Sequence, residues 1–231
     1  MDEAPAYFRW MVSRISPFLG KNVLDLGSGY GTHLTQILPR VEKITALDSS
    51  PEAAKFLAER FKTFSQFRAV CTDFSQQPLP GWMRISKFDT VLSLNLLEHL
   101  PDDIKALRCM NSLLPASQGV LILQVPAHPG LYGSLDKQAR HVRRYRKAEL
   151  AVKLEQTGFK VLHIEFFNRL GAIFWGLNAR LLHNRRYSKF FDFQIRLFDR
   201  LLVPVLKPLE YLVPLPFGLS ILAVAVKQRE A

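Results

Sequence analysis

The stretch that decides the fold of this 231-residue chain is Val23-Leu24-Asp25-Leu26-Gly27-Ser28-Gly29-Tyr30-Gly31-Thr32. It begins with a short apolar run that predicts a buried strand. Three alternating glycines follow, and they allow a sharp turn and a close approach of the backbone to a ligand. Residues 33–38 then predict a helix whose first amides face that ligand. A strand, a glycine loop and a helix N-terminus in this order predict a nucleotide site of the Rossmann type.

The glycine spacing and the acid before it narrow the choice of nucleotide. A dinucleotide fingerprint is Gly-x-Gly-x-x-Gly, and its third glycine, counted from Gly27, would fall at Thr32. This spacing disfavours a nicotinamide dehydrogenase. Asp25 would repel a pyrophosphate, whereas it suits an ammonium or a sulfonium. The segment resembles motif I of the class I S-adenosylmethionine-dependent methyltransferases; the alternative is a glycine turn in another kind of α/β protein.

Later strand ends agree with this resemblance. Residues 43–48 predict a second strand, and Asp48 at its end is placed to accept hydrogen bonds from both ribose hydroxyls. The resemblance puts Asp73, at the end of a third strand, near the adenine amino group. Asn95-Leu96-Leu97-Glu98-His99 follows the fourth strand and resembles motif IV of the small-molecule methyltransferases, beside the transferable methyl group. We therefore expect S-adenosyl-L-methionine to contact Asp25, Gly27, Ser28, Gly29, Gly31, Asp48, Ser49, Asp73, Phe74, Asn95 and Leu96.

The acceptor side is predicted beyond the fifth strand, residues 120–126. A His-x-Arg-Arg-Tyr segment that leads into Lys-Ala-Glu-Leu resembles a subgroup of these methyltransferases found among bacterial enzymes linked to polysaccharide or glycolipid assembly. The segment offers His141 as a general base, with the alternative that it only lines the pocket. Its arginines suit anions, although some of them would be solvated residues at a helix entry. The residues expected here are His141 and Tyr145 as catalytic groups, with His128, Tyr132, Arg143 and Arg144 as acceptor contacts.

The fold expected is a doubly wound α/β domain with a seven-stranded, mostly parallel sheet. Residues 1–168 and 218–231 would form the methyltransferase core. Residues 169–217 would be a helical insertion between the sixth and seventh strands, with helices over 170–182 and 189–206 and several prolines from residue 204 onward that end the helical pattern. We interpret the insertion as a lid over the acceptor or a surface that lies on a membrane. The alternative is packing on the core or on a partner subunit.

The charge of the chain is concentrated in one region. The formal net charge is +11, and residues 137–207 hold 16 Lys and Arg against 5 Asp and Glu, whereas the rest of the chain is balanced. Such confinement favours an anionic substrate, membrane surface or partner there, with a solubilising face as the alternative. Two cysteines are too few for a disulfide framework or a cysteine metal site, and no metal is expected. The first residues lack a signal-peptide pattern, so we expect a cytoplasmic protein, with peripheral contact at the inner face of the membrane as an option.

The function expected is methyl transfer from S-adenosyl-L-methionine to an oxygen or nitrogen of a small acceptor, anionic or linked to a lipid or sugar. One alternative is a basic methyltransferase that binds RNA or DNA, which the absence of a recognised nucleic-acid module disfavours. Another is a catalytically silent binding scaffold. The sequence leaves the acceptor and the oligomeric state open.

Overall fold

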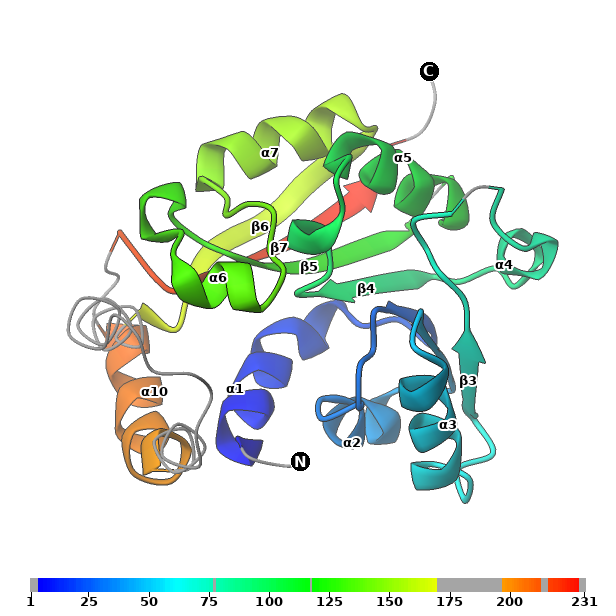
Figure 1. The fold of residues 1–231 in the computed structure, drawn as a ribbon, viewed down its shortest axis with the longest axis horizontal. Coiled ribbons are helices and arrows are strands. Elements are labelled where there is room, and N and C mark those ends of the chain that lie inside the picture. The colour runs from blue at the N-terminus through cyan, green and yellow to red at the C-terminus, as the bar shows by residue number, and fades with distance from the viewer. Residues whose placement is uncertain (1–3, 77, 117, 170–196, 213–215, 229–231) are drawn as a thin grey trace.

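The computed structural model describes residues 4–76, 78–116, 118–169, 197–212 and 216–228. Within these residues a seven-stranded sheet has the order β3-β2-β1-β4-β5-β7-β6 (Figure 1). Its strands are β1 (Asn22–Leu26), β2 (Lys43–Asp48), β3 (Phe67–Cys71), β4 (Thr90–Leu94), β5 (Val120–Pro126), β6 (Phe159–Phe167) and β7 (Ser220–Lys227). The first five strands are parallel, and β7 runs antiparallel to both of its neighbours. The predicted seven-stranded, mostly parallel α/β fold is confirmed.

The central strands are apolar because helices cover both of their faces. Every residue of β4 is buried, and β1 and β5 are buried after their first residue. Such two-sided burial explains why these strands are apolar runs rather than alternating patterns. The chain leaves β1 toward β2 and β3 but leaves β4 toward β5, in the opposite direction along the sheet. Open α/β sheets bind their ligands at the carboxyl ends of the strands where the order reverses in this way.

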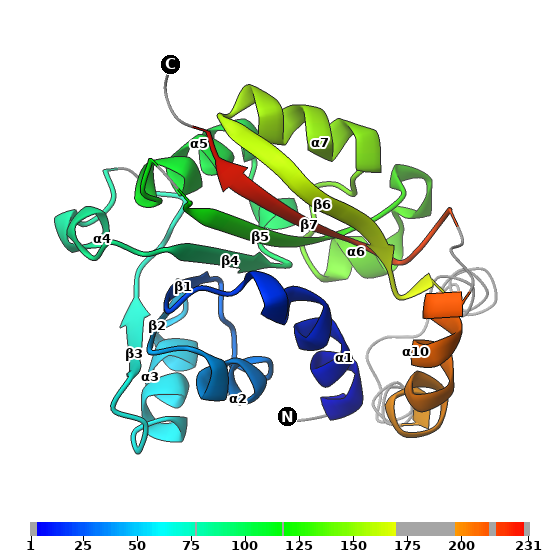
Figure 2. The same ribbon diagram turned by 180° about the vertical axis from the view of Figure 1, so that it is seen from behind.

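Two groups of helices cover the sheet (Figures 1 and 2). One hydrophobic cluster joins a face of the sheet to α4 (Gly81–Ile85), α5 (Asp103–Leu113) and α7 (Lys147–Gln156). A second cluster joins the other face to α1 (Pro5–Ile15), α2 (Leu34–Ile37) and α3 (Pro51–Arg60). The two clusters form the core of an α/β domain.

Local sequence signals explain where several helices begin. Ser50 caps α3, since its hydroxyl accepts a hydrogen bond from the Ala53 amide at 3.2 Å, and Pro51 is the first helical residue. The Asp102 carboxylate caps α5 by accepting from the Lys105 amide at 2.9 Å. Two short helices, α4 and α6 (Ser134–Gln138), lie in the connections that follow β3 and β5.

The described part of the insertion packs beside α1 (Figures 1 and 2). It consists of the π-helical turn η5 (Phe198–Leu202) and α10 (Val203–Leu212). The Asp199 carboxylate accepts hydrogen bonds from the amides of Ala6 and Tyr7, at 3.0 and 2.7 Å, and so joins the insertion to the first turn of α1. The predicted helix ending near residue 206 is wrong, because α10 continues through Pro208. The helix predicted over 170–182 lies outside the described residues, and none of the described helices is long and apolar enough to cross a membrane.

Candidate active site

The glycine loop after β1 is held by the end of β2. The amides of Gly27 and Ser28 both donate to the Leu47 carbonyl, at 2.8 and 3.0 Å. Gly31 has a φ of +68°, and a Cβ there would stand 2.5 Å from the Leu57 side chain, so both backbone and packing require glycine. The helix predicted over residues 33–38 is present as α2 (Leu34–Ile37), and a 3-10 turn continues it to Arg40.

Asp25 supplies a buried carboxylate beside this loop. It is 0% exposed, and its Oδ2 accepts a hydrogen bond from His33 Nε2 at 2.7 Å. Its Oδ1 is also buried and has no hydrogen-bond partner among the residues that the structure describes. A buried carboxylate oxygen needs a donor, and the α-ammonium of S-adenosylmethionine supplies one with the matching charge. The residues present therefore fit the cofactor that motif I implies.

Asp48 is oriented at the end of β2 by two backbone amides. Its Oδ2 accepts from Gly29 N at 2.8 Å and its Oδ1 accepts from Ser50 N at 2.9 Å. Each carboxylate oxygen keeps a further lone-pair site, so both can also accept from ribose hydroxyls. Ser49, between Asp48 and Ser50 in the sequence, is exposed. The arrangement suits the ribose role predicted for Asp48.

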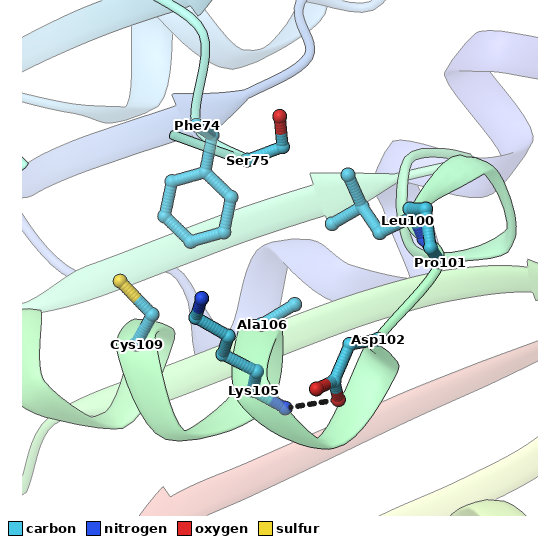
Figure 3. A pocket seen from close by; sticks show the side chains of 8 residues that line it. All are labelled: Phe74, Ser75, Leu100, Pro101, Asp102, Lys105, Ala106 and Cys109. Carbon is cyan, nitrogen blue, oxygen red and sulfur yellow. Dashed lines mark hydrogen bonds between the residues drawn. The ribbon is translucent and has the colours of Figure 1, made fainter. Parts of the chain in front are cut away.

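Phe74, the residue after Asp73, lines a pocket of about 270 Å³ between the segment after β3 and α5 (Figure 3). Hydrogen bonds from the hydroxyl and amide of Ser75 lower the pKa of Asp73, and Gln76 adds a third bond. The buried Phe74 side chain points toward α5 (Figure 3). The residues that line the pocket are Phe74, Ser75, Leu100, Pro101, Asp102, Lys105, Ala106 and Cys109. This largely apolar lining suits the adenine end of the cofactor.

The loop after β4 closes over the glycine loop. Asn95 has a φ of +56°, and its amide donates to the Gln124 carbonyl at 2.8 Å. Leu96 stands so close that a Cβ on Gly27 would lie 3.0 Å from its Cδ1. The loops predicted as motifs I and IV therefore meet at the carboxyl ends of the neighbouring central strands β1 and β4.

A cluster of ionisable side chains follows this loop. Glu98 is 0% exposed, both of its carboxylate oxygens lack a hydrogen-bond partner within the described residues, and burial raises its pKa to about 8. His141 Nε2 is 3.8 Å from Glu98 Oε1, and the His99 ring meets the His141 ring edge-on at 4.8 Å between centroids. Burial, together with the neighbouring His141, lowers the pKa of His99. Both residues lie in the segment that resembles motif IV, and neither was among the predicted site residues.

Asp136 orients His141. Its Oδ1 lies 3.0 Å from His141 Nδ1, and the same oxygen accepts from Arg144 Nε at 2.7 Å. Although burial opposes it, the hydrogen bonds from Arg144 and from the Gly133 amide lower the pKa of Asp136. A carboxylate beside His141 Nδ1 accepts a hydrogen bond from it, and in the neutral imidazole with its proton on Nδ1 the other nitrogen, Nε2, is the acceptor. Asp136 was not predicted as a site residue, although it stands five residues before His141.

Two residues predicted to contact the acceptor instead hold the loop together. Arg144 is buried, and it also donates to the Ala127 carbonyl at 3.2 Å. Tyr145 is 0% exposed, and its hydroxyl donates to Asp103 at 3.1 Å. Burial raises the pKa of Tyr145, with the Asp103 charge adding to the effect. Both side chains are thus bonded within the fold, and these contacts lend no support to the catalytic role predicted for Tyr145 or to the acceptor contact predicted for Arg144.

The other residues predicted for the acceptor side lie nearer the surface. Arg143 forms an ion pair with Asp103 at 2.8 Å, which partly neutralises the charge of its guanidinium group. The Tyr132 hydroxyl donates to the His141 carbonyl at 2.8 Å, and this bond supports the backbone of the histidine. His128 stacks on Phe166 with 5.1 Å between the ring centroids. These partly exposed groups remain available to line an acceptor site.

The donor atoms of Glu98, His99 and His141 lie within 4.8 Å of one another. Ligands of one tetrahedral ion, each about 2.0–2.2 Å from it, stand about 3.4 Å apart. The distances between these donor atoms would therefore have to shorten before the three residues could hold a cation. No sequence pattern had predicted a metal site here. Proton transfer by His141 requires no such shortening.

Comparisons with known proteins agree with this site. A family model described as a methyltransferase domain matches residues 3–164. A ubiquinone biosynthesis O-methyltransferase from Pseudomonas aeruginosa (strain LESB58) is 27% identical over 135 residues, which cover 57% of this chain and 55% of that protein. The chain thus matches about half the length of this relative.

Solved structures show the same fold at low identity. N-methyltransferase NodS from Bradyrhizobium japonicum, in complex with S-adenosyl-L-homocysteine, is 14% identical with a TM-score of 0.58, covering 97% of this chain and 86% of that one. The cyclase SpnF is 18% identical with a TM-score of 0.63, covering 96% of this chain and 82% of that one. Since the family model spans well over half of the sequence, this chain belongs to the methyltransferase-domain family, and it shares its fold with the solved N-methyltransferase.

Proposed function

We propose that this protein transfers the methyl group of S-adenosylmethionine to a hydroxyl oxygen of a small acceptor, with His141 as the general base. The observation that carries this proposal is the bond of His141 to Asp136, which leaves Nε2 free to accept a proton beside the loop after β4. A hydroxyl is a weak nucleophile until a base removes its proton, so O-methylation gains most from such a histidine. The name of the Pseudomonas relative, an O-methyltransferase, also favours oxygen over nitrogen.

The chain's own residues would bind and orient both reactants. Asp25 would accept from the amino acid end of the cofactor, Asp48 from its ribose, and Asp73 and Phe74 would contact its adenine. The cofactor supplies a methyl group already activated on a sulfonium. Positioning is therefore a large part of what the protein contributes.

The acceptor proposed is anionic. Lys137, Arg140 and Arg146 are exposed on the segment that carries His141. Exposed cations around a site raise the local concentration of anions. A carboxylate, a phosphate or a sugar-linked lipid would match this charge, whereas a nucleic-acid acceptor finds no support in a recognised binding module.

The insertion would act as a lid that also touches the membrane surface. Leu197, Leu201 and Val205 are 44%, 57% and 56% exposed at a four-residue spacing, on the segment that packs beside α1. Large apolar side chains exposed together in this way mark interaction surfaces. Arg200 is exposed on the same segment. Exposed apolar side chains together with basic charge favour peripheral contact with an anionic bilayer.

The test is methyl transfer from radiolabelled S-adenosylmethionine to a panel of phenolic, carboxylate and glycolipid acceptors. His141→Gln should bind S-adenosylhomocysteine as the wild type does and should lose about 100-fold or more in turnover. His163→Gln is the matched control, since this histidine pairs with Glu165 on β6 at 3.4 Å. Equal turnover of His141→Gln and the wild type would refute the base, and transfer to RNA or DNA alone would refute the acceptor class.

A further inference from the structure

We infer that His33 is a positioning residue for the cofactor. Its Nε2–H group holds one oxygen of Asp25, so that the other oxygen faces the α-ammonium of the cofactor as a charged acceptor. This inference rests on the proposed cofactor site, and it adds to that site a residue that no motif had indicated.

The His33–Asp25 pair is buried and close. The Nε2–Oδ2 distance is 2.7 Å, and the exposed fractions of the two side chains are 8% and 1%. This length is typical of a charge-assisted hydrogen bond, in which the carboxylate accepts and the ring nitrogen donates. The two residues are eight positions apart, one inside β1 and the other on the turn just before α2. The glycine loop between them brings the ring back over the strand.

The loop itself offers Asp25 Oδ1 no donor. The amides of Gly27 and Ser28 are bonded to the Leu47 carbonyl, and the Gly29 amide is bonded to Asp48. The Ser28 hydroxyl donates to the Asp25 backbone carbonyl at 3.0 Å rather than to its side chain. Among the described residues, the partner of the Asp25 carboxylate is therefore His33 at Oδ2, while Oδ1 stays buried and unpartnered. A ligand that carries a donor group would complete the hydrogen bonding of Oδ1.

The direction of the Asp25 carboxylate depends on His33, because without the Nε2–H group the side chain would be free to rotate Oδ1 away from the loop. A buried carboxylate oxygen is also costly when it has no donor. Phe8 of α1 lies against His33, with 6.5 Å between the ring centroids, and it helps to keep water from the pair. Replacement of the imidazole should therefore weaken ligands that carry an α-ammonium and spare ligands that lack one.

Two ligands separate this role from a general packing role. S-adenosylhomocysteine carries the amino acid portion, whereas methylthioadenosine shares its adenine, ribose and thioether but has no ammonium. Calorimetry would measure both affinities for the wild type, His33→Phe and His33→Gln. Phenylalanine fills the ring volume without a donor, and glutamine carries a donor at a similar reach. His163→Gln is the matched histidine control on a distant strand.

We expect His33→Phe to weaken S-adenosylhomocysteine about tenfold or more and methylthioadenosine less than about twofold. His33→Gln should recover most of the lost affinity. Asp25→Asn should show the same selectivity, and adding His33→Phe to it should cause little further loss, because the two residues act through one interaction. Circular dichroism would reveal whether His33→Phe folds. If it folds poorly, the two affinities of the Asp25→Asn and His33→Gln variants are compared with those of the wild type instead.

Equal losses for both ligands, or no loss for either, would overturn the role of His33 while leaving the cofactor site intact. Failure of the wild type to bind either ligand would overturn the proposed cofactor site, and the role of His33 with it.

Discussion

The buried carboxyl of Glu98 makes a quantitative prediction about stability and pH. Folding raises its pKa from 4.5 to about 8, because burial disfavours the charged form. Between these two values the folded protein holds a proton that the unfolded chain has released. The free energy of unfolding must therefore fall as the pH rises through this range.

The size of the effect depends on the two pKa values. A rise from 4.5 to about 8 corresponds to about 5 kcal/mol of stability, present below pH 4.5 and lost completely only above pH 8. Typical domains have only about 5–15 kcal/mol in total. Glu98→Gln has nearly the same shape and no ionisation. Relative to the wild type, this variant should therefore gain about 5 kcal/mol between pH 4 and pH 9.

Urea denaturation of the wild type and Glu98→Gln at several pH values measures this difference. Other ionisable groups contribute to both proteins and largely cancel. Glu155→Gln is the matched control, because Glu155 is exposed on α7, and its difference from the wild type should stay nearly constant. A difference between Glu98→Gln and the wild type that is also independent of pH would refute the assignment of Glu98 as a neutral buried acid.

Three further predictions concern ligands and surfaces. Asp48→Ala should weaken S-adenosylhomocysteine at least about tenfold in calorimetry, because hydrogen bonds from the ribose to a charged acceptor are lost; unchanged affinity would contradict the ribose role. Dialysis against EDTA should leave the initial rate of methyl transfer unchanged, whereas a loss restored by a divalent cation would show that Glu98, His99 and His141 hold an ion. Leu201→Ser with Val205→Ser should reduce flotation of the protein with anionic liposomes, since apolar area and basic charge act together at a bilayer surface; equal flotation of variant and wild type would exclude this face as the membrane contact.

The sheet could be predicted because its signals are local. The residues from Asp25 to Gly31 combine a strand and a glycine turn within a few positions, and each central strand is a buried apolar run. Asp48 could be found in the same way, as an acid at a strand end. The end of the helix in the insertion could not be predicted, because the insertion packs against α1 and accepts, at Asp199, hydrogen bonds from the first turn of that helix. Proline alone did not end α10.

The sequence could not show which site residues are buried, because a motif does not report burial. Arg144 and Tyr145 have the chemistry of ligand contacts, yet the bridge between Ala127 and Tyr145 draws this segment against the end of β5 and into the core. His33 was missed because its contact with Asp25 depends on how the glycine loop folds back. The sequence did offer one signal: His33 stands eight residues after Asp25, just beyond the glycine loop.

The measurement that tests the central claim most directly is a crystal structure with S-adenosyl-L-homocysteine bound. The adenine should lie beside Asp73 and Phe74, both ribose hydroxyls should reach Asp48, and the α-ammonium should donate to Asp25 Oδ1. The sulfur should then face the side of the site that carries His141. A ligand bound elsewhere, or one whose sulfur points away from His141, would contradict the proposed site.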